Sequence, residues 1–249
     1  MSMNILDEIR NQYYDFNYNA KFLEVLHRSF EIYLRTSARS NEKLKALHGF
    51  ISTTLQNLIG YEYKINSLGF RDDKEASAPG RYMDKKVDIT VSRRGKIVAG
   101  LAVKFVMSNY SQNSNNYFEC MLGETANIRS NRIPYFQIFI IPDKIPYYDK
   151  QGGISRWEEI TQHNLDKYVN LSNDDADVYM HTPNKTFVGV VHMDDCPWSV
   201  RNFQLYKNYY LTHPFTFSYS DRRIEFGNTV IYNDFDSYIK KIAHFILSI

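Results

Sequence analysis

An aspartate and a lysine lie in two nearby apolar segments of the chain. Asp88 stands in KVDIT and Lys104 stands in GLAVKFV. A lysine inside an apolar segment costs free energy to bury without a partner, and Asp88 is the obvious candidate. A carboxylate can also hold a divalent cation, with an ammonium beside it. The two residues therefore indicate either a functional pair or a structural ion pair.

The segments that carry this pair are predicted to form a β-hairpin. Apolar and polar residues alternate over 86–93, Arg94-Gly95 is typical of a turn, and 97–106 is an almost continuous apolar run. Because side chains alternate between the two faces of a strand, Ala102 and Lys104 share one face. The hairpin is therefore expected to bring Asp88 and Lys104 together.

The series VDI, then GLAVKF, then a polar tract and a helix resembles the PD-(D/E)XK nuclease superfamily, which includes many type II restriction endonucleases. The resemblance covers about 41–142. It implies a mixed central sheet flanked by helices, double-stranded DNA as the substrate, and Mg²⁺ as the cofactor with Mn²⁺ as a substitute. It also implies a homodimer, because two-fold symmetry matches a palindromic site and cuts both strands.

One position departs from the family motif, since Ala102 stands where the motif has Asp or Glu. Some restriction endonucleases resemble this arrangement and take the second carboxylate from the following helix, which is predicted here over 117–129. Glu119 in its first turn and Glu124 are the two candidates. The third alternative is that neither glutamate reaches the site.

The resemblance implies a role for each of these residues. Asp88, Glu119 or Glu124, and the main-chain carbonyl near Val103 supply the oxygen ligands of the metal ion. The metal lowers the pKa of a bound water and neutralises charge on the scissile phosphate. Lys104 orients the attacking water or helps to deprotonate it, so Asp88, Lys104 and Glu119 are the expected catalytic residues.

Other polar residues offer further contacts. Glu42, at the start of the helix predicted over 41–59, matches an acid that family members often add, although an acid there also complements the helix dipole. His192 to Cys196 contains metal-ligand residue types, but no second cluster accompanies it and a structural role is expected. The loop predicted over 108–116 holds residues able to contact phosphates or bases: Tyr110, Asn113, Asn115 and Asn116.

The composition is typical of a soluble globular chain. Of 249 residues, 43% are hydrophobic and 23% are charged, and the net charge is +2. No apolar run approaches the roughly 18 residues that a membrane span needs, and no signal peptide is apparent. Cys120 and Cys196 do not suggest a disulfide framework. We therefore expect a cytoplasmic protein with no membrane partner.

Charge is distributed unevenly along the chain. Segment 143–177 contains four basic and eight acidic residues, whereas 79–104 contains seven basic residues and only two acidic ones. The basic stretch is expected either to surround the candidate site or to form an ordinary solvated hairpin. Its seven basic residues are Arg81, Lys85, Lys86, Arg93, Arg94, Lys96 and Lys104.

The expected fold is α/β, with a mixed central sheet, N-terminal helices and a C-terminal α+β extension. Apolar residues at helical spacing predict the 41–59 helix, which Ser40 or Asn41 can cap and Gly60 can end. We expect one domain over 1–249, with a nuclease-like core at about 41–142. Segment 143–249 would then supply DNA recognition and dimer contacts. Further strands are predicted at 61–67, 135–141 and 186–192, and further helices near 164–170 and from about 234.

Three functions fit these patterns. The first is a metal-dependent DNA endonuclease of the restriction type. The second is a DNA-binding protein that keeps the nuclease fold without the chemistry, for which Ala102 is the best argument. The third is an α/β interaction protein in which the Asp88–Lys104 pair is structural.

Overall fold

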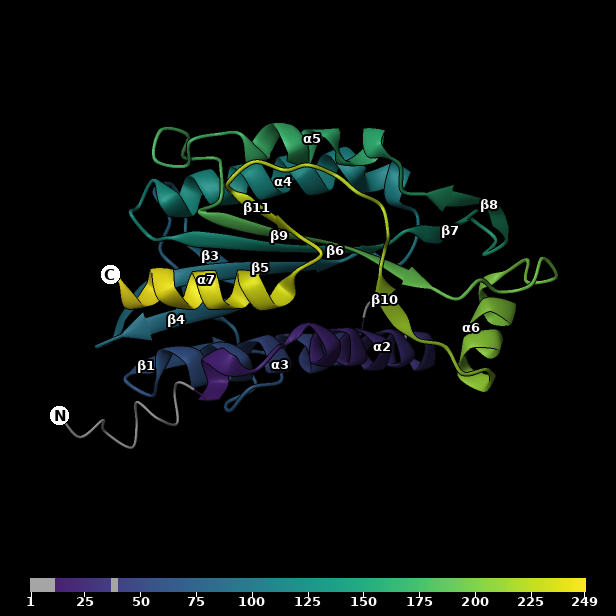
Figure 1. Ribbon diagram of the computed structural model, residues 1–249, viewed down its shortest axis with the longest axis horizontal. Coiled ribbons are helices and arrows are strands. Elements are labelled where there is room, and N and C mark those ends of the chain that lie inside the picture. The colour runs from purple at the N-terminus through teal and green to yellow at the C-terminus, as the bar shows by residue number, and fades with distance from the viewer. Residues whose placement is uncertain (1–11, 37–39) are drawn as a thin grey trace.

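A mixed sheet lies at the centre of the computed structural model, which describes residues 12–36 and 40–249 (Figure 1). Strands β1, β4 and β5 pair antiparallel, and β5, β6 and β9 run parallel to one another. The expected class, a mixed sheet flanked by helices, is confirmed. Across the sheet the order is β1 (Tyr63–Ser67), β4 (Ile89–Arg93), β5 (Lys96–Phe105), β6 (Tyr135–Pro142), β9 (Lys185–Met193) and β10 (Phe217–Tyr219), with β11 (Val230–Tyr232) also paired to β9.

Helices cover both faces of this sheet (Figure 1). One face carries α4 (Tyr110–Arg129) and α5 (Gln162–Ser172), and the other carries α2 (Asn19–Arg35), α3 (Glu42–Ile59) and α7 (Phe235–Leu247). Alternate β6 residues pack into the two cores, because Phe136, Ile138 and Ile140 face α2, α3 and α7 while Phe139 and Ile141 face α4 and α5. Burial on both faces accounts for the continuous apolar run of this strand.

The ends of α3 follow the sequence signals. The Ser40 hydroxyl accepts a hydrogen bond from the Glu42 N–H at 3.2 Å, and Gly60 ends the helix at φ 88°. The Asn41 side chain makes no capping hydrogen bond. Both predicted helix boundaries are confirmed, with Ser40 providing the side-chain contact.

The start of α4 was predicted wrongly, because the helix begins at Tyr110 and the polar tract is its first two turns. Tertiary contacts hold this Asn-rich segment in a helix despite its low intrinsic propensity. The Tyr110 ring is buried, Ser111 donates to the Glu158 carboxylate, and the Lys167 ammonium donates to the Ser114 carbonyl at 2.8 Å. Glu119 is consequently in the third turn of the helix and not in its first.

The strand predicted over 86–93 is broken at Asp88. Residues before it form β3 (Lys85–Val87), which pairs with β2 (Ala76–Ala78) in a small separate sheet. Residues after it form β4 in the main sheet, opposite the Gly100–Leu101 part of β5. Asp88 therefore lies at a junction between two sheets and belongs to neither strand.

The C-terminal segment contributes directly to the main sheet, since β9 lies against β6 and α7 packs on the face that α3 also covers. Its first hairpin, β7 (Lys144–Tyr148) with β8 (Ile154–Glu159), and helix α6 (Phe203–Thr212) were not predicted. Among the described residues, no helix has the length and apolar character needed to cross a bilayer.

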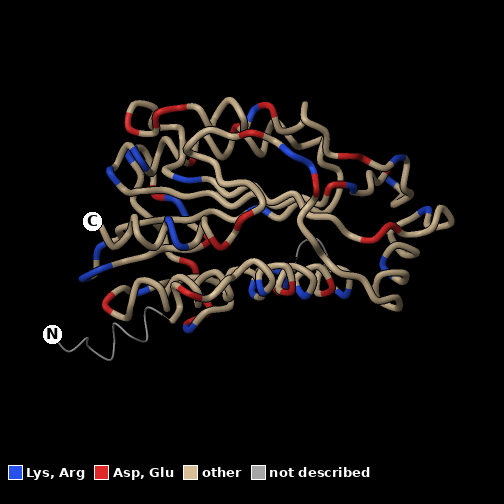
Figure 2. Tube along the Cα trace, in the orientation of Figure 1, with Lys and Arg blue, Asp and Glu red and all other residues tan. Residues whose placement is uncertain are grey.

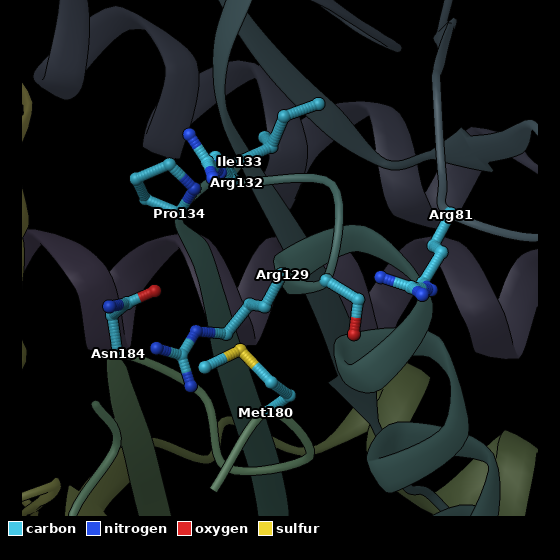
Figure 3. A pocket seen from close by; sticks show the side chains of 8 residues that line it. Arg81, Arg129, Arg132, Ile133, Pro134, Met180 and Asn184 are labelled. Carbon is cyan, nitrogen blue, oxygen red and sulfur yellow. The ribbon is translucent and has the colours of Figure 1, made fainter. Parts of the chain in front are cut away.

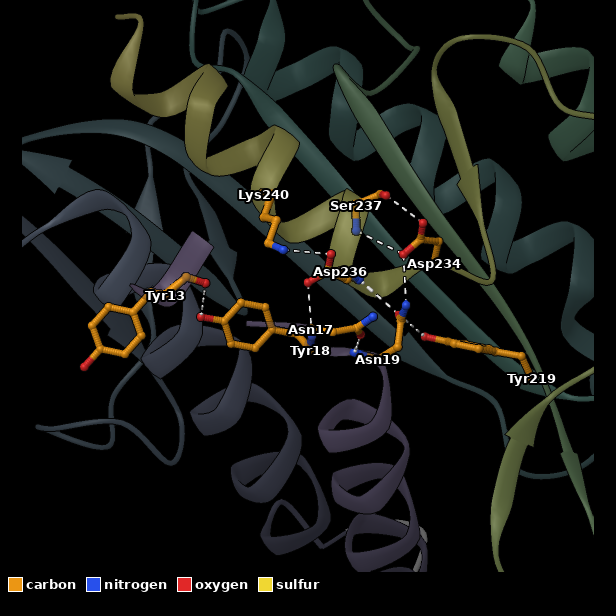
Figure 4. Close-up of polar contacts among 9 residues, drawn as sticks. All are labelled: Tyr13, Asn17, Tyr18, Asn19, Tyr219, Asp234, Asp236, Ser237 and Lys240. Carbon is orange, nitrogen blue, oxygen red and sulfur yellow. Dashed lines mark hydrogen bonds and ion pairs between the residues drawn. The ribbon is translucent and has the colours of Figure 1, made fainter. Parts of the chain in front are cut away.

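The two ends of the described chain are joined by a polar network (Figure 4). The Tyr18 N–H donates to the Asp236 carboxylate at 3.0 Å, and the Asn19 amide donates to Asp234 at 3.0 Å. Asp234 also accepts from the Ser237 N–H at 3.1 Å and caps α7. These bonds fix the start of α2 against the start of α7.

Candidate functional site

A cavity of about 350 Å³ opens beside the junction at Asp88. Asp88 and Lys104 both line it, as the hairpin geometry predicted. Helix α4 closes one side with residues three and four positions apart, Tyr117, Cys120, Met121 and Glu124, which share one helix face. The remaining lining residues are Lys85, Lys86, Ala102, Val103, Gln137, Ile138, Phe139 and Tyr168.

Asp88 is held by the main chain of β5. Its carboxylate accepts a hydrogen bond from the Val103 N–H at 2.7 Å. The pKa of Asp88 is raised to about 6, chiefly by burial; the carboxylates of Glu75 and Glu124 add to the rise, whereas the Val103 hydrogen bond and Lys104 reduce it. Three carboxylates therefore gather here; Glu75 and Glu124 each pair with a lysine, whereas Asp88 is held mainly by the Val103 N–H.

Lys104 does not form the close ion pair with Asp88 that its position in an apolar strand suggested. Its ammonium lies over the Tyr117 ring, 4.0 Å from the ring centroid. Although part of this side chain is exposed, desolvation lowers the pKa of the ammonium, and Asp88 partly offsets that effect. Because the Lys104 ammonium lies over the Tyr117 ring and forms no close ion pair with Asp88, its N–H donors remain available to a bound ligand.

Of the two candidate helix carboxylates, Glu124 lines the cavity and Glu119 does not. The Lys85 ammonium contacts Glu124 at 2.8 Å, and the Tyr135 hydroxyl donates to the same carboxylate. Glu119 is exposed and lies off the helix face that Tyr117 and Glu124 share, with Lys167 as its charged neighbour. The placement of Glu119 at the site is corrected accordingly.

Two residues that the sequence did not single out converge on Asp88 from the other side. One ligand atom each of His48, Glu75 and Asp88 lies within 4.8 Å of the other two. His48 is fully buried in α3, and neither ring nitrogen has a hydrogen-bond partner among the described residues. Burial lowers the pKa of His48 to about 4, so the imidazole is neutral at neutral pH. Glu75 contacts the Lys86 ammonium at 2.9 Å.

Glu42 is not the residue that α3 brings to the site. Its carboxylate contacts the Lys45 ammonium at 3.1 Å, and its side chain is largely exposed. His48 lies among the apolar residues of α3, so the sequence pattern predicts an ordinary core residue at this position. Its two unpartnered nitrogens are the feature that sets it apart, and only coordinates reveal them.

The basic stretch divides between different places. Lys85, Lys86 and Lys104 line the cavity. Arg93, Arg94 and Lys96 lie at the β4–β5 turn, the blue tip at the left end of Figure 2, which is roughly 26 Å from Lys104 at 3.3 Å per residue. The stretch does not surround the site as a whole.

The remaining candidates lie apart from Asp88. The Tyr110 hydroxyl donates to the Asn164 carbonyl at 3.2 Å, and Asn113, Asn115 and Asn116 lie in the first two turns of α4 and do not line the cavity. His192 contacts Asp143 at 3.0 Å at the end of β9. Cys120, which lines the cavity, and Cys196 are both free cysteines.

The arrangement at Asp88 suits a divalent cation, because it combines carboxylates with a neutral, unpartnered imidazole. Two lysines already neutralise the flanking glutamates, and Asp88 retains a raised pKa. No family model, curated protein sequence or solved structure matches this chain.

Proposed function

We propose that this chain is a divalent-metal-dependent DNA endonuclease with a PD-(D/E)XK-like core, of the type II restriction kind. The element order α3, β1, β4, β5, α4, β6 supports this core, with Asp88 immediately before β4 and Lys104 near the end of β5. One observation carries the proposal: Asp88, Lys104 and the helix carboxylate Glu124 line one cavity.

The residues around Asp88 fit a metal ion. One set of ligands consists of Asp88, Glu75 and His48. A ring nitrogen of His48, which has no hydrogen-bond partner among the described residues, would donate its lone pair to the metal ion. Mg²⁺ prefers oxygen ligands, while an imidazole favours Mn²⁺ and other transition metals. We therefore propose that the enzyme uses Mg²⁺ and accepts Mn²⁺ at least as readily.

Val103 and Glu124 complete the oxygen ligands on the cavity side. In an extended strand the N–H and the C=O of one residue point to the same neighbour, so the Val103 carbonyl is on the side of Asp88. Glu124 replaces the acid that Ala102 lacks. This assignment keeps the predicted ligands Asp88, Val103 and Glu124, and omits Glu119.

The chemistry assigned to the site is hydrolysis of a phosphodiester bond. A bound divalent ion supplies a water of lowered pKa and neutralises charge on the phosphate. Lys104 orients the attacking water and donates to the phosphate oxygens, where negative charge grows in the transition state. Lys85 and Lys86 now contact Glu124 and Glu75, and both ammonium groups would become available to phosphate groups if these glutamates held a cation.

The proposed substrate is double-stranded DNA, cut at a specific site in the cytoplasm. A homodimer would place two such cavities on the two strands of a palindromic sequence. The β7–β8 hairpin and α6 extend beyond the main sheet at one end of the molecule (Figure 1). We propose that these elements of 143–249 contribute sequence recognition or dimer contacts.

A second candidate function is a DNA-binding protein without cleavage, and Ala102 favours it. In that protein Asp88 and Lys104 would be structural. Equal DNA affinity for the parent and for Asp88→Ala, with no cleavage by either in Mg²⁺ or Mn²⁺, would support this candidate.

Cleavage of plasmid DNA tests the proposal. Purified protein is incubated with an unmethylated plasmid and Mg²⁺ or Mn²⁺, beside Lys104→Met and Lys96→Met. Both changes remove an ammonium from β5 and keep the aliphatic stem, but Lys96 lies at the other end of the strand. Discrete fragments from the parent and Lys96→Met, and none from Lys104→Met, are expected. Equal cleavage by Lys104→Met would contradict the assigned role of Lys104.

A further inference from the structure

A second cavity, of about 430 Å³, lies where α4 ends and β6 begins (Figure 3). Arg81 enters it from the loop before β3, Arg129 from the last turn of α4, and Arg132 from the turn that follows. The other lining residues are Ser130, Ile133, Pro134, Met180 and Asn184. The described lining thus contains three guanidinium groups and no acidic side chain.

These arginines lack close acidic partners. Within the described chain no carboxylate lies within ion-pair distance of the Arg81, Arg129 or Arg132 guanidinium, and Asp177 is the acid that acts on Arg129 from further away. Arg129 is nearly buried and donates to the Tyr179 and Thr182 carbonyls at 2.9 and 2.6 Å. Three like charges around one cavity repel each other unless an anion binds between them.

The loop that carries Arg81 is fixed against α4. The Arg81 N–H donates to the Asn127 carbonyl at 2.8 Å, and the Asn127 side chain accepts from the Tyr82 N–H at 3.0 Å. The same side chain donates to the Met83 carbonyl at 2.8 Å, and Asn131 donates to the Pro79 carbonyl at 2.8 Å. The backbone that carries Arg81 is therefore held in place by α4, which lowers the entropic cost of binding.

We propose that this cavity binds a phosphate group, gripped by the exposed side chains of Arg81 and Arg132 over the fixed guanidinium of Arg129. Guanidinium groups bind phosphate oxygens in a bidentate manner, and a phosphate balances several of them at once. If the proposed function holds, the ligand is a backbone phosphate of the DNA that also enters the Asp88 cavity. Glu124 and Arg129 are only about 7.5 Å apart along the axis of α4, at 1.5 Å per residue.

The test compares the parent with Arg81→Ala/Arg132→Gly. Glycine is chosen at 132 because Arg132 has φ 61°, so the change removes the charge and relieves the backbone. Arg28→Ala is the matched control, since Arg28 is exposed on α2 at the opposite face of the sheet. Binding of a short DNA duplex is measured by fluorescence anisotropy without metal, over a series of salt concentrations. Unfolding with and without inorganic phosphate is measured in parallel.

We expect the double variant to bind duplex at least about fivefold more weakly, with a salt slope reduced by about 1, while Arg28→Ala is unchanged. Unchanged affinity and slope, together with equal stabilisation of both proteins by inorganic phosphate, would overturn the proposal. Stabilisation of the parent alone by phosphate, without a difference in duplex binding, would identify free phosphate as the ligand. A reduced slope in a protein that cleaves no plasmid would leave this site standing and remove the proposed activity.

Discussion

At the residue scale, Asp88 combines a main-chain hydrogen bond with a poorly balanced charge. Its carboxylate is fixed by the Val103 N–H, and burial together with Glu75 and Glu124 raises its pKa to about 6. An ionised carboxylate with a raised pKa lowers the stability of the fold when no cation is bound. Binding of a cation would restore that stability. The same residue is therefore expected to lower stability and to provide function.

The change Asp88→Asn tests directly whether the charge of Asp88 lowers the stability of the folded protein. Because the pKa is higher in the folded protein than the ordinary 3.8, the folded state holds the proton more tightly, and stability is lost as pH rises towards about 6. Asparagine keeps the acceptor for Val103 without the charge. We expect its free energy of unfolding in metal-free buffer to exceed the parent's by about 2 kcal/mol at neutral pH. This raises Tm by roughly 4–8 °C.

Below about pH 3 the difference between Asp88→Asn and the parent should vanish, because the parent carboxyl is then protonated in both the folded and the unfolded state. Thermal unfolding across this pH range provides the measurement. A stability difference that stays constant with pH would show that charge at Asp88 is not its source.

Glu124 and Glu119 form a matched pair on one helix. We expect Glu124→Gln to reduce DNA cleavage by on the order of 10²-fold, because a ligand at the cavity loses its charge. Glu119→Gln should leave the rate within about twofold, since an exposed side chain away from the site changes little. Cleavage rates measured under single-turnover conditions test this prediction. A larger loss of rate in Glu119→Gln than in Glu124→Gln would identify Glu119 as the metal ligand from α4.

At the element scale, the β5–α4 unit positions the site, and its glycines are not equivalent. A Cβ at Gly100 would lie 2.9 Å from carbons of the buried Tyr135 ring, whose hydroxyl contacts Glu124. A Cβ at Gly123, in the middle of α4, would meet nothing within 4 Å. At Gly100, β5 packs closely against the Tyr135 ring and leaves no room for a side chain, whereas α4 has free space at Gly123.

We expect Gly100→Ala to destabilise the protein by about 1–3 kcal/mol, because the ring cannot move without disturbing Glu124. Gly123→Ala should stabilise it by about 0.5–1 kcal/mol, because alanine restricts the unfolded chain and favours helix. Denaturant unfolding of both variants measures these changes. Destabilisation by Gly123→Ala would mean that this face of α4 is more crowded than the structure describes.

The elements also mark the limit of local sequence signals. Apolar periodicity predicted α3, β5 and β6, because burial of one or both faces leaves a repeating pattern. It missed the first two turns of α4, where Glu158 and Lys167 hold an Asn-rich segment in place. Contacts between segments about 50 positions apart leave no periodic trace in either one.

At the scale of the whole molecule, the site is assembled from distant parts of the chain. Asp88, Lys104 and Glu124 could be proposed as partners because a hairpin and the next helix bring them close. His48 and Glu75 could not, because one lies in an apolar helix face and the other in a polar loop without periodicity. The packing of α3 against β1, and of the β2–β3 sheet against β4, brings both to Asp88.

Binding of Mn²⁺ tests the central claim, that Asp88 is the centre of a divalent-cation site, most directly. Mn²⁺ is titrated at neutral pH into the parent, Asp88→Asn, His48→Gln and Glu119→Gln, and electron spin resonance detects the bound ion and its nitrogen ligand. We predict binding to the parent and to Glu119→Gln, loss of binding in Asp88→Asn, and loss of the nitrogen signal in His48→Gln. Undiminished Mn²⁺ affinity in Asp88→Asn would contradict the account.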